Sequence, residues 1–136
     1  MMEINNLTRI RLDEKTLRKA AKEVLRGERK SKAELSVVFA NPAKIRELNK
    51  KYRKKNCPTD VLTYIYDKSS GEIMICPQIV KKNAKEFGST FKKEMIRVLT
   101  HGVLHFLGYD HEKGGQKAKK MKKKEELYLY KTLNTK

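Results

Sequence analysis

The three histidines of this 136-residue chain all fall within one stretch, HGVLHFLGYDH. His101 and His105 are four residues apart, so in a helix their side chains lie on one face. Gly108 is suited to the left-handed conformation that ends a helix, so the chain can turn there and bring His111 toward the first two. Three imidazoles then leave one tetrahedral position open, which is typical of a catalytic zinc site. Zinc is the usual occupant, although three imidazoles also suit nickel or copper.

The spacing of the histidines equals that of the metzincin peptidases, whose motif is H-E-x-x-H-x-x-G-x-x-H. Those enzymes place a glutamate after the first histidine as general base, whereas this chain has Gly102 there. Peptide hydrolysis of that type is therefore disfavoured, unless Asp110, Glu72 or Asp60 acts as the acid or base from another position. Asp110 could equally orient a ligand or cap the turn.

A largely buried helix must position the first two histidines. From Met95 onward the segment FKKEMIRVLTHGVLHFL is apolar nearly all round, and Ser89 could cap its start. A second helix is expected near the C-terminus, over residues 116–133. Its inner face would carry four residues: Ala118, Met121, Tyr128 and Leu129.

The rest of the chain alternates between helix and strand patterns. We expect strands over residues 35–39, 61–66 and 72–75, the last two paired as neighbours. Further helices are expected from Asp13 to a terminating Gly27, from Pro42 onward, and from Pro77 to Gly88 with Phe87 facing inward. These patterns predict one α+β domain over residues 1–136. A small mixed sheet of about four strands is packed by about five helices, with the metal site at the end of a buried helix.

The net charge favours a polyanionic partner. Lysine and arginine number 33 against 16 aspartates and glutamates, which gives +17, and nucleic acid is the default partner for such an excess. Residues 113–124, KGGQKAKKMKKK, contain seven of the lysines. We expect Lys117 and Lys120, together with Lys55, to hold an RNA backbone. The alternative is a solvated helix face.

Composition also indicates where the protein acts. No stretch approaches the ~20 apolar residues of a membrane span, and the N-terminus lacks the apolar core of a secretion signal. Cys57 and Cys76 are too few for a disulfide scaffold, so we expect reduced thiols and a cytoplasmic protein.

Two long motifs carry a resemblance to the YbeY family, metal-dependent bacterial endoribonucleases involved in ribosomal RNA maturation. The stretch HGVLHFLGYDH meets the family's histidine motif, H-G-x-L-H-x-x-G-Y-D-H, at every defined position. Residues 48–62, LNKKYRKKNCPTDVL, match L-N-x-x-Y-R-x-K-x-x-P-T-D-V-L. A third family segment, G-D-I, appears as residues 71–73 with glutamate in place of the aspartate. The similarity runs from about Leu48 to the last helix.

The resemblance implies one zinc per chain, held by His101, His105 and His111. It also implies an essential arginine beside the metal, at Arg53, and a guanidinium there can hold a phosphate through two hydrogen bonds. Arg53 could otherwise be a surface residue at a helix end. The implied activity is single-strand-specific endonucleolytic cleavage in ribosomal RNA processing, at the 3′ end of 16S rRNA, and in ribosome quality control. The implied partners are ribosomal RNA, ribosomal particles and ribosomal or assembly proteins.

Three questions stay open at the level of the sequence. The nucleophile could be the RNA 2′-hydroxyl or a water molecule. The protein could instead be a non-catalytic ribosome-assembly factor, in which a side chain such as Asp110 fills the fourth position of a structural zinc. A metallopeptidase with a rearranged base is the remaining alternative.

Overall fold

A mixed four-stranded sheet lies at the centre of the computed structural model, which describes residues 2–53, 60–109 and 115–134. Its strands are β1 (Met2–Asn6), β2 (Glu34–Phe39), β3 (Val61–Asp67) and β4 (Ser70–Ile75). They lie in the order β1-β2-β4-β3. The β1–β2 and β2–β4 pairs are parallel, and the β3–β4 pair is antiparallel. The predicted pairing of β3 with β4 is therefore confirmed.

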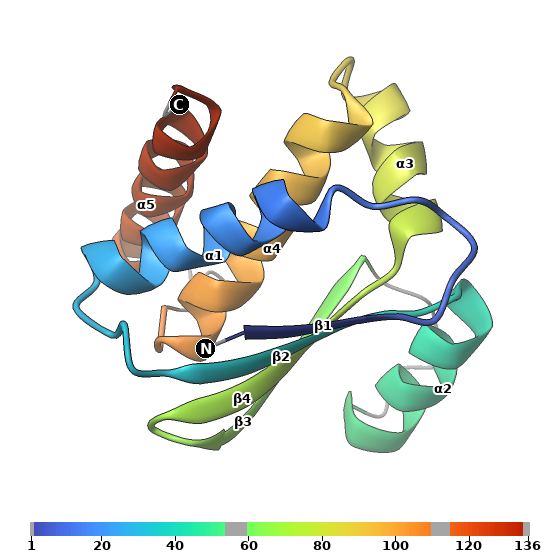
Figure 1. Ribbon diagram of the computed structural model, residues 1–136, viewed down its shortest axis with the longest axis horizontal. Helices are drawn as coiled ribbons and strands as arrows, with labels where there is room; N and C mark the ends of the chain where they lie inside the picture. Colours follow the sequence, from blue (N-terminus) through green and yellow to red (C-terminus); the bar gives the residue numbers. More distant parts are fainter. Residues whose placement is uncertain (1, 54–59, 110–114, 135–136) are drawn as a thin grey trace.

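The helices cover both faces of this sheet (Figure 1). They are α1 (Glu14–Gly27), α2 (Pro42–Arg53), α3 (Pro77–Glu86), α4 (Phe91–Phe106) and α5 (Gly115–Asn134). Five helices and a mixed sheet of four strands, counted over the described residues, confirm the predicted α+β class. The short strand β1 was not among the predicted strands.

Strand β4 divides the buried residues into two sets because its side chains alternate between the faces of the sheet. Ile73 and Ile75 belong to the larger core, which also includes buried residues of α1, α4 and α5. Met74 belongs to a smaller cluster with Ile45 of α2 and Leu62 of β3. Helices α4 and α2 therefore lie on opposite faces of the sheet.

Helix α4 begins and ends through local hydrogen bonds. Thr90, and not Ser89 as predicted, caps its start, because the Thr90 side chain accepts a hydrogen bond from the Lys93 backbone N–H. At the other end Gly108 has φ +102°, and its N–H donates to the His105 carbonyl over 3.0 Å. The left-handed glycine predicted to end the histidine helix is confirmed.

One other expectation was wrong: Phe87 is 65% exposed, because α3 ends at Glu86 and Phe87 follows as its C-cap. Helix α1 ends at Gly27 as predicted, although Arg29, and not Gly27, takes the positive φ of 60°. The reason for a glycine at 27 is space: a Cβ there would lie 2.5 Å from the hydroxyl oxygen of Tyr128.

Within the described part of the chain, no helix combines the length and the hydropathy that crossing a membrane requires. Cys76 is buried with a free thiol, and Cys57 lies outside the described residues.

Candidate functional site

His101 and His105 form a pair on one face of α4, as their spacing predicts. The two rings are nearly parallel, at 23°, with their centroids 6.5 Å apart. Both side chains are partly exposed on a helix whose other faces are buried in the core, and His101 retains 20% of its side-chain accessibility. The pair therefore lies where an ion or a substrate can reach it.

A carboxylate from α5 orients the first of these rings. The Nδ1 atom of His101 lies 3.0 Å from Oε1 of Glu125. Since a carboxylate only accepts hydrogen bonds, Nδ1 carries the proton in this contact, and the lone pair of the ring then lies on Nε2. An imidazole held in this way by a carboxylate is the usual arrangement of a metal-ligating histidine.

Glu125 is itself held by an ion-pair network. Arg97 lies 3.5 Å from Oε1 of Glu125 and forms two hydrogen bonds to the buried carboxylate of Glu94. These hydrogen bonds to Glu94 raise the pKa of Arg97, and the charges of Glu125 and Asp60 add to the effect. Arg97 therefore stays charged and fixes Glu125 beside His101.

The donor set fits a metal ion that prefers nitrogen. Two imidazoles share one helix face, and one of them has its tautomer set by a carboxylate. Over residues 2–53, 60–109 and 115–134, no three histidine, cysteine, aspartate or glutamate side chains are grouped so that they could hold a metal ion. His111, the predicted third ligand, lies outside the described residues, as does Asp110.

Packing explains why glycine occupies the position of the metzincin base. Gly102 is buried against the sheet, and a Cβ on it would lie 2.9 Å from Cγ2 of Ile73. The Thr63 hydroxyl also donates to the Gly102 carbonyl over 3.4 Å. A glutamate at this position would have to enter the interface between α4 and the sheet, so it could not serve the histidine face.

The remaining predicted site residues are Asp60, Glu72, Arg53 and Lys55, and the structure describes the side chains of only the first two. Asp60 precedes β3, and its backbone carbonyl accepts a hydrogen bond from the Cys76 N–H over 2.9 Å; its charge contributes to the raised pKa of Arg97. Glu72 accepts a hydrogen bond from the Tyr66 hydroxyl over 3.3 Å and lines a cavity with residues of α2. Glu72 therefore lies on the α2 side of the sheet, away from the histidine pair. Arg53 is the last residue of α2; its side chain lies outside the described residues, and so does Lys55.

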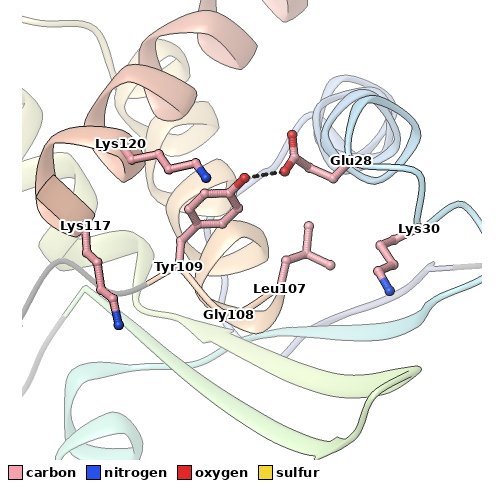
Figure 2. Close-up of a pocket in the computed structure, with 7 residues that line it drawn as sticks. All are labelled: Glu28, Lys30, Leu107, Gly108, Tyr109, Lys117 and Lys120. Carbon is pink, nitrogen blue, oxygen red and sulfur yellow. Dashed lines mark hydrogen bonds between the residues drawn. The ribbon is translucent and has the colours of Figure 1, made fainter.

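A second carboxylate fixes the chain just beyond α4. Glu28 follows α1, and its Oε1 accepts a hydrogen bond from the Tyr109 hydroxyl over 2.5 Å (Figure 2). Its Oε2 accepts from the Tyr128 hydroxyl and from Lys124 Nζ. The two tyrosines and Lys124 thus connect α1, the end of α4 and α5 through one carboxylate.

This network changes the ionisation of its members. Burial by itself raises the pKa of Glu28, but the hydrogen bonds from Tyr109, Tyr128 and Lys124 outweigh it and the pKa lies below its usual value. Burial and the bond to Glu28 raise the pKa of Tyr109 to about 12 and raise that of Tyr128 as well. At neutral pH the carboxylate is charged and both phenols remain donors.

Sequence reasoning did not identify Glu125 or Arg97. A signal was present, because Glu94, Arg97, His101 and His105 follow one another at helical spacings of three and four on an otherwise apolar helix. That stripe marks a polar face. Glu125 could not be found in the same way, since its contact with His101 spans 24 residues.

Comparison with known proteins relates this chain to one family of endoribonucleases. The family described as Endoribonuclease YbeY matches residues 3–133. Endoribonuclease YbeY of Thermotoga neapolitana is 43% identical over 100 residues, which cover 73% of this chain and 67% of the relative. The match thus spans about two thirds of that relative's length. Endoribonuclease YbeY of Petrotoga mobilis is 38% identical over 136 residues, covering 95% and 94%. Among solved structures, the solution structure of TM1509 from Thermotoga maritima has a TM-score of 0.72 and 34% identity, covering 97% of this chain and 89% of that one.

Proposed function

Because the chain belongs to the YbeY family of endoribonucleases, hydrolases that act on RNA, we propose that it cleaves single-stranded ribosomal RNA with a zinc ion held by His101, His105 and His111. One observation carries the assignment of the metal site: His101 and His105 share a helix face, and Glu125 holds the Nδ1 of His101. This arrangement supports metal ligation through Nε2. When bound, zinc polarises a phosphate oxygen or activates the nucleophile.

The chain's own residues have separate parts in this proposal. Glu125 orients the His101 ring, and the Glu94–Arg97 pair keeps Glu125 in place. Arg53 binds the scissile phosphate and stabilises the charge that develops on it, which a planar guanidinium does well through paired hydrogen bonds. We propose Asp60, whose charge contributes to the raised pKa of Arg97, as the acidic residue that assists proton transfer.

The charge of the protein supports a long polyanionic substrate. The net charge is +17, and Lys117 and Lys120 are exposed on α5. Contacts from lysines to phosphates give affinity without sequence preference. We propose that the cellular substrate is the 3′ end of 16S rRNA, in the cytoplasm, with further use in ribosome quality control. Ribosomal particles or assembly proteins would then direct so small an enzyme to one bond.

Two substitutions test the proposal. Arg53→Ala is expected to abolish cleavage of a single-stranded rRNA fragment while the zinc content stays at one per chain. Lys50→Ala, an exposed change on the same helix, is the matched control and should cleave normally. Unchanged cleavage by Arg53→Ala would remove this residue from the mechanism. His101→Ala is expected to lose both zinc and cleavage.

Product ends distinguish the two routes of attack. A 2′,3′-cyclic phosphate indicates attack by the 2′-hydroxyl, whereas a 3′-hydroxyl with a 5′-phosphate indicates attack by water. If the protein binds ribosomal RNA, keeps that binding in His101→Ala and cleaves nothing, the assembly-factor alternative replaces the nuclease. Peptide cleavage that survives Arg53→Ala would favour the metallopeptidase.

A further inference from the structure

A cavity of about 400 Å³ opens directly beside the end of the histidine helix (Figure 2). One wall is the segment Leu107 to Tyr109, which follows α4. The opposite wall is formed by Glu28 and Lys30, between α1 and β2, and Lys117 and Lys120 of α5 complete the lining. Three segments that are distant in the sequence thus enclose one volume.

The lining is cationic. Lys30 lies on one side of the cavity, and Lys117 and Lys120 of α5 lie on the other, as the sticks in Figure 2 show. Within the described parts of the chain, none of the three forms an ion pair with an acidic side chain. Lys124, one turn further along α5, differs because it lies 3.1 Å from Glu28. The cavity thus has three ammonium groups in its lining.

The single carboxylate of the lining does not cancel this charge. Both oxygens of Glu28 already accept hydrogen bonds, from Tyr109 on one side and from Tyr128 and Lys124 on the other. These contacts hold Glu28 against the protein and compensate its charge there. They also fix the Tyr109 ring, over which Lys120 Nζ lies 5.9 Å from the centroid. The cavity thus has a wall that is ordered before any ligand enters.

The cavity is close to the histidine pair in structure as well as in sequence. The N–H of Gly108, which lines it, donates to the backbone carbonyl of His105 over 3.0 Å. Lys124 and Glu125 are consecutive on α5, and the first contacts Glu28 while the second contacts His101. The cavity and the histidine pair therefore adjoin the same two helices, α4 and α5.

We propose that the cavity is a subsite for a backbone phosphate of single-stranded RNA, bound by Lys30, Lys117 and Lys120 beside the bond that is cleaved. This inference rests on the proposed function, which makes RNA the substrate. It extends that function by assigning the strand a path from the histidines toward the connection between α1 and β2. Phosphate contacts of this kind fix the register of a strand on the protein without reading its bases.

Helix α5 offers a matched control for the subsite. Lys117, Lys120 and Lys124 follow one another at spacings of three and four, so they share the face turned toward the cavity. The exposed residues Lys119, Lys122 and Lys123 lie on the same helix but do not line the cavity. If positive charge strengthens RNA binding in general, removing either set of lysines should weaken binding. If the cavity is a subsite, only the removal of the cavity lysines should weaken it.

The experiment compares two triple variants, in which Lys30, Lys117 and Lys120 or Lys119, Lys122 and Lys123 are changed to alanine. Binding of a fluorescent single-stranded RNA is measured by anisotropy at low and at physiological salt, and cleavage of the same RNA is measured in parallel. We expect the cavity variant to bind about tenfold more weakly, with a log–log salt dependence that is shallower by about 0.7 for each phosphate that no longer meets a lysine. The control variant should bind within about threefold of the wild type. Changing the three cavity lysines to arginine should restore binding.

Equal weakening in the two alanine variants, or normal binding by the cavity variant, would overturn the subsite. The subsite and the nuclease activity fail separately in this design. If the wild-type protein cleaves RNA and the cavity variant binds it normally, the subsite is wrong and the proposed function stands. If no protein cleaves RNA, the proposed function fails, and the binding comparison still decides the subsite.

Discussion

Glu28 connects three elements through one carboxylate, so we expect Glu28→Ala to lower the free energy of unfolding by about 3 kcal/mol. The side chain is 12% exposed and accepts hydrogen bonds from Tyr109 and Tyr128 as well as from Lys124. Each hydrogen bond to a charged group contributes roughly 1.5–3 kcal/mol. The Lys124 side chain is 32% exposed, so its ion pair with Glu28 adds at most about 1 kcal/mol to the free energy of unfolding. Side-chain ordering and desolvation of the carboxylate offset part of this sum.

Urea and thermal unfolding followed by circular dichroism measure the effect. A loss of about 3 kcal/mol corresponds to a fall in Tm of about 10 °C in a chain of this size. Glu126→Ala removes an exposed carboxylate of α5 and should change stability by less than about 0.5 kcal/mol. Glu28→Gln keeps the shape of the side chain and is expected to fall between the wild type and Glu28→Ala.

The effect should also depend on pH. The pKa of Glu28 is lowered in the folded protein, so its stabilisation is present above the usual value of 4.5 and is lost as the pH falls through the folded-state pKa. The difference between wild type and Glu28→Ala should therefore shrink on acidification. Equal stability of the two proteins at pH 7, or a difference that does not change with pH, would refute the role assigned to this carboxylate.

Three further predictions follow from the described contacts. Glu125→Gln should weaken zinc affinity about 10–100-fold in competition with a chelator, and Glu126→Gln should not; equal affinities would exclude the orienting role of Glu125. Gly102→Ala should destabilise the protein by about 1–3 kcal/mol in urea unfolding, because its Cβ would meet Ile73, and wild-type stability would contradict the packing described. Tyr109 should titrate near pH 12 in a spectrophotometric titration. Its hydrogen bond to Glu28 therefore stabilises the folded protein fully below pH 10.0, and this contribution is lost as the pH rises through about 12. Ionisation of Tyr109 near pH 10.0 would contradict the hydrogen bond to Glu28.

Local patterns predicted most of the fold because they arise within single elements. The Asp13 that caps α1, the proline that opens α3 and the left-handed Gly108 are local signals that do not depend on packing against other elements. Strand β1 escaped prediction because its sequence, MEINN, is short and polar, and it forms by pairing with β2 along the edge of the sheet. Its stability depends on a partner about thirty residues away.

In the candidate site, too, the contacts within one helix could be predicted from the sequence, and the contacts between elements could not. The spacing of His101 and His105 on one helix placed them together correctly, since i and i+4 positions share a face. The contacts of Glu125 with His101 and of Glu28 with Tyr109 join residues 24 and 81 positions apart. Such pairs depend on how α1, α4 and α5 pack, which no local pattern contains.

The cleavage rate of a single-stranded rRNA fragment, measured while zinc is titrated into chelator-treated protein, shows whether hydrolysis depends on a metal ion held by the three histidines. If His101, His105 and His111 hold the metal on which hydrolysis depends, cleavage should be absent at the start, rise with added zinc and reach a plateau at one zinc per chain. Cleavage at full rate by the metal-free protein would contradict the account.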